Sequence, residues 1–283
     1  ILLIFTFRPD FVHTWGRRSF HNEVNLNRLS NRESLLMATN ILGVDVLDRD
    51  LEDLILKKTE GVPFFIEEFI KSLKDLKVIQ RKDNRYALAK AIKEVTIPST
   101  IQDVIMARVD SLPEGAKEVL QTGSVIEREF SYELIKQVTG LPEKELLTHL
   151  GVLKDSELLF ERGIFPETTY IFKHALTQEV VYDSILTREK QRLHEEIGNA
   201  IEELYKDNLH EHYGVLAEHF ISSENNEKGA EYCRLAGEKA VRAGSFHDAI
   251  GYGKKQIVCF EKLPQTNAVV KSLIDARTKT GHY

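Results

Sequence analysis

The sequence has no long apolar run and little cysteine. No stretch approaches the roughly 20 apolar residues that a membrane-spanning helix needs. The longest run, Ile1–Phe5, has neither the basic segment nor the cleavage site of a signal peptide. The two cysteines, Cys233 and Cys259, are typical of buried thiols in a reducing compartment. We therefore expect a cytoplasmic protein without a membrane span.

An excess of positive charge is also missing. The chain carries 38 Lys and Arg against 44 Asp and Glu, a formal net charge of −6. No overall basic field therefore favours nonspecific binding of nucleic acid. With 283 residues the chain exceeds one average domain, which predicts two or three modules.

A phosphate-binding loop is absent from the sequence. Neither GxxxxGKS nor GxxxxGKT occurs, and no apolar strand ends in paired acids that hold magnesium. Gly251–Lys255 has the composition of such a loop, but it lacks the spacing and the hydroxyl and lies in a helical pattern. On its own, the chain is expected to hydrolyse no ATP.

The first residues have the pattern of a buried parallel strand. Ile1–Phe7 is short and apolar, and Pro9 ends it because proline donates no ladder hydrogen bond. Arg8 is thereby presented at the carboxyl edge, where open α/β sheets bind ligands. Asn22–Leu26 predicts a second short strand.

Helical patterns begin at Ser30. Ser30 followed by Glu33 is a capping-box signature, a second helix should end at Gly61, and Pro63 suits the first position of a third. Residues 78–88 favour a small β-hairpin. The apolar faces of the first and third helices are expected at Leu35, Leu36, Ile41, Leu42, Phe65, Ile66, Phe69, Ile70, Leu73 and Leu76.

Short helices and two strands follow. Helices are expected at 100–111, 114–123, 131–139, 142–156, 174–186 and 187–206, and strands at 158–160 and 170–172. Three helices followed by a β-hairpin are the order of a winged helix.

The last part, from about residue 211, is rich in alanine and helical. Small and aromatic residues there have the spacing of tetratricopeptide repeats: Gly237, Ala240, Gly244, Phe246 and Ala249. Gly253 and Gln256 depart from that pattern, so we expect repeat-like α-hairpins.

Several short motifs together resemble one family. They are Phe7-Arg8-Pro9, Gly61-Val62-Pro63, Ile97–Gln102, Ala107–Asp110, Val125-Ile126, Glu129-Phe130 and Phe172–Leu176. Their order is similar to that of STAND-type signal-transduction ATPases, in particular the predicted AAA-like ATPases attached to bacterial class III adenylate or guanylate cyclases and to kinases. The resemblance runs from residue 1 to about 262.

The resemblance implies a mainly α fold in five parts. These are the last strands of a RecA-like α/β NTPase domain (1–27), a helical lid with a small hairpin (28–96), a winged helix (97–186), a connecting helix (187–210) and the start of a TPR-like array (211–283).

It also implies an adenine-nucleotide site. Arg8 would sense the γ-phosphate of ATP, Pro63 in the Gly61–Pro63 turn would pack on adenine, and His174 would reach the β-phosphate of ADP. Magnesium and the phosphate loop would lie upstream of Ile1. The plain alternatives are a solvated arginine, a helix-start proline and a structural histidine. Lys173-His174-Ala175 stands where one branch of the family has Met-His-Asp.

The implied function is sensing and relay of nucleotide state, with a protein partner on the repeats and ATPase activity only within a longer protein. The alternative is a scaffold or transcription-regulatory module that binds no nucleotide. The predicted helix at 142–156 balances Glu143, Glu145 and Asp155 against two lysines, which argues against DNA binding. His210, His212 and His219 lack the further ligands of a metal site.

Overall fold

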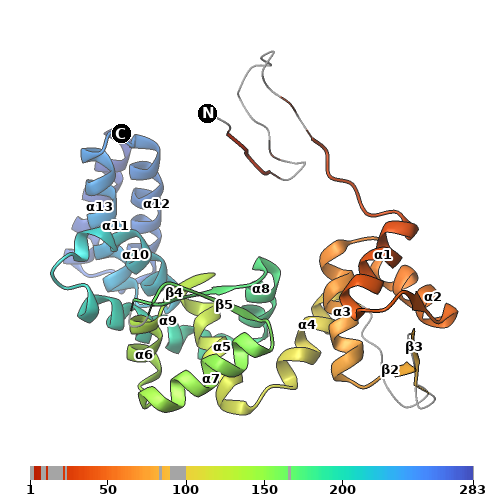
Figure 1. The fold of residues 1–283 in the computed structure, drawn as a ribbon. Coiled ribbons are helices and arrows are strands. Elements are labelled where there is room, and N and C mark those ends of the chain that lie inside the picture. Colours follow the sequence, from red (N-terminus) through yellow and green to blue (C-terminus); the bar gives the residue numbers. More distant parts are fainter. Residues whose placement is uncertain are drawn as a thin grey trace. The chain divides into compact units, whose positions relative to one another are not determined.

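A computed structural model describes residues 3–7, 11, 22, 24–82, 85–89, 100–164 and 167–282. The described residues are mainly helical, with thirteen α-helices and two three-stranded sheets. The chain divides into two compact units, Ile1–Ile70 with Val78–Ile92 and Lys71–Lys77 with Lys93–Tyr283 (Figure 1). Within the described ranges no helix has the length and apolarity needed to cross a membrane.

The first unit contains two helices, most of a third and one small sheet. Its elements are α1 (Asn31–Leu42), β1 (Val46–Leu47), α2 (Arg49–Thr59), α3 (Pro63–Asp75, which continues into the second unit), β2 (Ile79–Lys82) and β3 (Arg85–Leu88). The strand order is β1-β3-β2, with β1 parallel and β2 antiparallel to β3. The hairpin β2–β3 was predicted, whereas the parallel partner β1 was not.

Local signals place the helix ends as expected. The Ser30 side chain accepts from the Glu33 amide and the Glu33 side chain accepts from the Ser30 amide, so the capping box is confirmed. Pro63 is the first residue of α3, also as predicted. The buried face of α1 is formed by Ala38 and Leu42, while Leu36 is 60% exposed. The prediction that Leu36 faces the core was wrong, because the helix turns it outward.

The predicted N-terminal strands do not form in the described residues. Residues 3–7, 22 and 24–26 have no regular secondary structure, and Leu3 and Ile4 are exposed. A central parallel strand gains its stability from hydrogen-bonded neighbours and from burial on both faces. The described part of the chain supplies no strand that pairs with these residues.

The second unit opens with short helices around an antiparallel sheet. Its elements are α4 (Ile101–Asp110), α5 (Glu114–Ile126), β4 (Glu129–Ser131), α6 (Tyr132–Thr139), α7 (Glu143–Asp155), β5 (Leu159–Arg162) and β6 (Thr169–Phe172). The sheet order is β4-β6-β5, so the first strand of this sheet pairs with the last. The helices α6 and α7 lie between these two strands in the sequence. The helices and the β5–β6 hairpin were predicted, and β4 was not recognised as a strand.

Arg108 joins the last turn of α4 to the end of α7. Its side chain is 6% exposed and donates from Nη2 to the Ser156 backbone oxygen at 2.5 Å. Its Nε lies 3.8 Å from a carboxylate oxygen of Asp75. A buried arginine with these partners orders the helix ends, which gives the Ala107–Asp110 motif a structural role.

The second unit ends in a series of helices. They are α8 (Ala175–Ser184), α9 (Thr187–Leu204), the 3₁₀ turn η2 (Leu209–Glu211), α10 (Tyr213–Ser222), α11 (Asn226–Arg242), α12 (Phe246–Lys262) and α13 (Asn267–His282). From α10 to α13 each helix packs on the next, as Figure 1 shows. The small residues Ala217, Ala236 and Ala249 are buried between them, which allows close approach of the helices.

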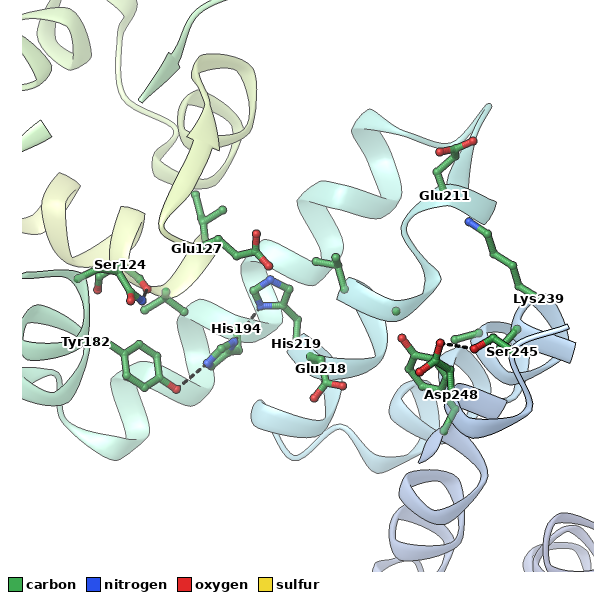
Figure 2. A pocket seen from close by; sticks show the side chains of 18 of the residues that line it. Ser124, Glu127, Tyr182, His194, Glu211, Glu218, His219, Lys239, Ser245 and Asp248 are labelled. Carbon is green, nitrogen blue, oxygen red and sulfur yellow. Dashed lines mark hydrogen bonds between the residues drawn. The ribbon is translucent and has the colours of Figure 1, made fainter. Parts of the chain in front are cut away.

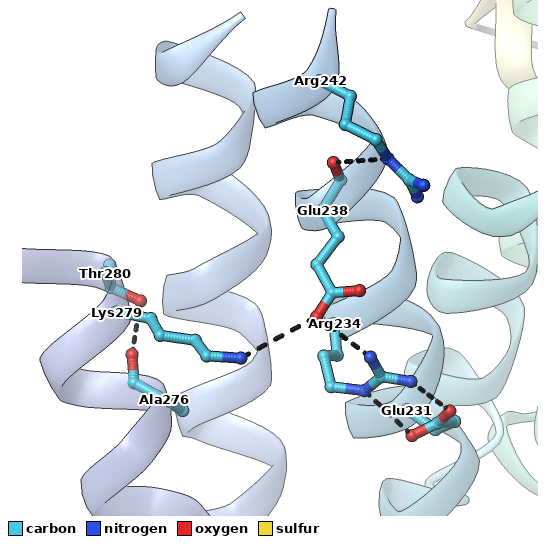
Figure 3. A network of polar contacts seen from close by, with 7 residues as sticks. All are labelled: Glu231, Arg234, Glu238, Arg242, Ala276, Lys279 and Thr280. Atoms are coloured by element: carbon cyan, nitrogen blue, oxygen red, sulfur yellow. Dashed lines mark hydrogen bonds and ion pairs between the residues drawn. The ribbon is translucent and has the colours of Figure 1, made fainter. Parts of the chain in front are cut away.

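A polar network runs along α11 and reaches α13 (Figure 3). Arg234 contacts the carboxylates of Glu231 and Glu238, one turn before and after it. Lys279 of α13 lies 3.8 Å from the Glu238 carboxylate. Since exposed ion pairs contribute little free energy, the buried faces carry most of the packing.

Candidate functional site

The sequence-predicted nucleotide residues fall in different parts of the chain. Arg8 lies outside the described residues. Gly61 and Pro63 belong to the first unit, and His174 to the second.

Gly61 is required by backbone geometry. Its φ is 73°, in the left-handed region, and a Cβ added to it would lie 2.2 Å from the Leu29 backbone oxygen. The Leu29 amide in turn donates to the Gly61 oxygen at 2.8 Å. Only glycine permits both the conformation and this close approach. The turn thus fixes where α3 begins.

Pro63 starts α3 with an exposed ring. Proline suits this position because its missing N–H would find no partner in the first helical turn. The exposed ring leaves an apolar face in reach of a ligand. The structural and the ligand-binding interpretations of Pro63 are therefore compatible.

His174 stands at the junction of β6 and α8. It is the N-cap of α8, with extended backbone (φ −130°, ψ 138°), and its side chain makes no capping hydrogen bond. Its carbonyl accepts from the Thr177 amide at 3.1 Å, and the preceding Lys173 amide donates to the Leu158 oxygen at 3.0 Å. A strand and a helix thus fix the backbone from which the half-buried imidazole projects.

A cavity of about 650 Å³ lies within the second unit (Figure 2). Its walls come from the end of α5, from α8, α9, η2 and α10, and from α11 and α12. The volume is in the range of sites that bind small molecules or side chains of a partner. The described residues therefore include one concave site in addition to the predicted nucleotide residues.

A chain of three hydrogen-bonding side chains forms one side of this cavity. The Tyr182 hydroxyl lies 3.0 Å from His194 Nε2, and His194 Nδ1 lies 2.8 Å from His219 Nδ1. His194 is 8% exposed and His219 is 5% exposed. Figure 2 shows the three side chains in a row.

Both imidazoles in this chain are neutral near pH 7. Burial lowers the pKa of His194 to about 4, and the nearby Lys190 ammonium adds to the shift. Burial also lowers the pKa of His219 to about 3, with His194 as the second cause. Burial, and to a smaller degree Asp183, raises the pKa of Tyr182, so its hydroxyl keeps its proton.

The hydrogen-bond chain has two proton arrangements. Because one Nδ1 must donate to the other, His219 Nε2 is an acceptor when His219 donates and a donor when His194 donates. His219 lines the cavity, and its Nε2 has no hydrogen-bond partner among the described residues. The cavity therefore offers a ligand a neutral imidazole nitrogen that can either accept or donate a hydrogen bond.

Carboxylates surround the neutral part of the cavity. Glu127, Glu211, Glu218 and Asp248 line it, against Lys239 as the one lysine or arginine among its lining residues. The Lys239 ammonium donates to the His210 backbone oxygen at 2.9 Å, so its charge is held by a protein partner. Glu218 pairs with the Lys255 ammonium, so the negative charge around the cavity comes mainly from Glu127, Glu211 and Asp248.

One face of α8 connects His174 to this cavity. His174, Gln178 and Tyr182 are spaced by four residues and lie on one side of the helix. Gln178 and Tyr182 line the cavity, and Gln178 Nε2 donates to the Ser124 oxygen of α5 at 2.6 Å. The helix α8 therefore extends from His174 to the wall of the cavity.

Sequence reasoning missed the pairing of His194 with His219. It grouped His219 with His210 and His212, but His212 stacks on Tyr205 with ring centroids 4.1 Å apart. The available signal was the position of His194 between Leu193 and Ile197, on the apolar face of the predicted helix at 187–206. A histidine on such a face requires a buried polar partner.

Comparison with known proteins gives limited information. A family described as "Domain of unknown function (DUF8739)" matches residues 30–86, which extend from the N-cap of α1 into β3. No curated protein matches the sequence significantly.

Proposed function

We propose that this chain is the nucleotide-state sensing and relay part of a STAND/AAA-like signalling ATPase. In this proposal the second unit contains a winged-helix domain (97–186), whose strands and central helices are α5 to β6, followed by TPR-like hairpins that bind a protein partner. Arg8, Pro63 and His174 read ATP or ADP held, with magnesium, by a phosphate loop in a longer protein.

The observation that carries the proposal is the position of His174. The order α5-β4-α6-α7-β5-β6 and the sheet order β4-β6-β5 are those expected of a winged helix, and His174 follows its last strand directly. The family resemblance assigns a phosphate contact to a histidine at this point. Because β6 and α8 meet at His174, a ligand that contacts this side chain can change the positions of both elements.

The relay runs along α8 in this account. His174 is the N-cap of α8. Tyr182, eight residues further along the same helix, forms a hydrogen bond with His194 at the cavity. A charge-assisted hydrogen bond contributes about 1.5–3 kcal/mol. A differential contact of that size changes a two-state equilibrium by about 10- to 150-fold.

The proposed winged helix is unsuited to DNA. Lys136 of α6 pairs with Glu143 at 3.2 Å, and Lys154 of α7 pairs with Glu161, which leaves Lys144 as the one α7 lysine without an ion pair among the described residues. Phosphate contacts need free basic side chains. Packing against protein is the role that this surface supports.

The test is the affinity for ADP of the longer protein that contains the phosphate loop. His174→Ala is expected to weaken ADP binding at least 10-fold in calorimetry, whereas His247→Ala, an exposed histidine on α12, leaves it unchanged. Equal ADP affinity of His174→Ala and the unmodified protein contradicts the proposal.

The second candidate is a scaffold that binds protein without nucleotide. The cavity favours it, since the site is built wholly within the second unit. A phosphate loop within roughly one domain length, about 150 residues, upstream of Ile1 in the gene supports the ATPase. Absence of that loop supports the scaffold.

A further inference from the structure

We propose that the cavity of the second unit binds a basic peptide segment, with a lysine or arginine side chain inserted between α8–α9 and α10–α12. The proposal deepens the partner-binding part of the proposed function by naming the site and the chemistry of the partner. Its test involves no nucleotide, so the two proposals can fail separately.

Charge complementarity gives the first argument. The lining carboxylates come from the end of α5, η2, α10 and α12, so they are distributed around the cavity. Glu218 already pairs with Lys255, but Glu127 and Asp248 have no ion pair within the described part of the chain, and Glu211 pairs only with the imidazole of His210, at 3.6 Å. A single small amine cannot meet carboxylates on several elements at once. An extended segment with more than one positive charge can.

The His219 ring gives an independent argument. It is 5% exposed, lines the cavity and presents an Nε2 without a hydrogen-bond partner among the described residues. Because this nitrogen opens to the cavity, a ligand N–H can donate to it in place of solvent. The arrangement in which His219 donates to His194, and His194 donates to Tyr182, makes Nε2 the required acceptor.

The walls suit the stem of a long side chain. Val215, Ala236, Ala240 and Ala243 supply apolar surface, and Tyr252 lines the same cavity. Lysine and arginine bury their methylene stems on such surfaces while their charged ends remain near polar groups. The small alanines leave the space that the stem occupies.

Direct binding to the whole 283-residue chain tests the proposal. Fluorescein-labelled octa-arginine and octa-lysine are expected to bind in anisotropy titrations at physiological salt, and octa-glutamate is not. The triple variant Glu127→Gln/Glu211→Gln/Asp248→Asn should weaken binding at least 10-fold. A control triple, Glu118→Gln/Glu179→Gln/Glu227→Gln, removes the same charge from exposed positions outside the cavity and should weaken it less than about 3-fold.

A second pair of variants adds a bulky side chain without changing the charge of the protein. Ala243→Trp places a ring at the cavity and should also weaken octa-arginine binding at least 10-fold, whereas Ala268→Trp on exposed α13 should not. Agmatine, a small guanidinium compound, should compete only at far higher concentration than the peptide. Equal effects of the two charge triples, equal effects of the two tryptophans, or competition by agmatine at the peptide's own concentration overturns the proposal. Loss of nucleotide binding leaves it intact.

Discussion

At the scale of single residues, the structure gives a reason for a glycine that the sequence motif alone does not explain. The motif Gly61-Val62-Pro63 was interpreted through its resemblance to a nucleotide turn, and the structure adds a steric reason for its glycine. A left-handed φ and the Leu29 oxygen 2.2 Å from a would-be Cβ exclude every other residue. That requirement depends on a contact 32 residues away along the chain, so local sequence does not reveal it.

Gly61→Ala should therefore destabilise the first unit by at least about 2 kcal/mol, because strain in the left-handed region adds to overpacking. Gly43 is the matched control: its φ is 63°, but a Cβ there meets nothing within 4 Å. Gly43→Ala should cost about 1 kcal/mol, from the conformation alone. Hydrogen exchange of the α1 and α3 amides measures both. Equal losses contradict the steric account.

At the scale of elements, the sequence predicted the helix ends and hairpins that depend on residues close together in the chain. Ser30 acts as an N-cap where expected, and the hairpins β2–β3 and β5–β6 form. Pairings between distant segments were missed, as for β1 with β3 and β4 with β6. Apolar alternation cannot specify a two- or three-residue strand, whose existence depends on its partner.

The departure of Gly253 from the repeat pattern has a packing explanation. On α12 it faces α13, and a Cβ would lie 2.2 Å from Thr280 Oγ1 and 3.1 Å from Thr280 Cβ. Rotation of the threonine relieves the first contact but not the second. The glycine thus sets the distance between α12 and α13.

Gly253→Ala should lower the free energy of unfolding by about 1 kcal/mol, since overpacking exceeds the gain in helix propensity. Gly251→Ala, two residues away on an exposed face with nothing within 4 Å, should instead raise it by roughly 0.5–1 kcal/mol. Urea unfolding monitored by circular dichroism measures both. In a Thr280→Gly background, which lacks that Cβ, Gly253→Ala should no longer lower the free energy of unfolding, and an undiminished loss there refutes the contact.

At the scale of the whole molecule, the second unit is organised around a buried pair of histidines. They come from α9 and α10 and are 25 residues apart, so no local pattern predicted their contact. Tyr182 of α8 completes the chain, and Lys190 is the charged neighbour that shifts the pKa of His194. The pair makes the stability of this unit sensitive to mild acid.

The sign follows from the lowered pKa values. In the unfolded chain both histidines bind protons below about pH 6.5, but in the folded protein their pKa values are about 4 and 3. Stability is therefore fully present above pH 6.5 and falls as the pH decreases towards 4. Between pH 7.5 and 5 the loss is at most about 2 kcal/mol per histidine.

Urea midpoints at several pH values measure this dependence. The double variant His194→Gln/His219→Gln should lose most of the decline below pH 6.5. His210→Gln/His247→Gln, which replaces two exposed histidines, should retain it. Retention of the full decline in the first double variant shows that other groups cause it.

The central claim is that nucleotide state reaches the repeats through His174 and α8. Hydrogen exchange of the Thr177–Tyr182 amides, in the longer protein with a phosphate loop, measures this most directly. We predict slower exchange with ADP than with a non-hydrolysable ATP analogue, and no difference between the two nucleotides in His174→Ala. Identical exchange in the two nucleotide states of the unmodified protein would contradict the account.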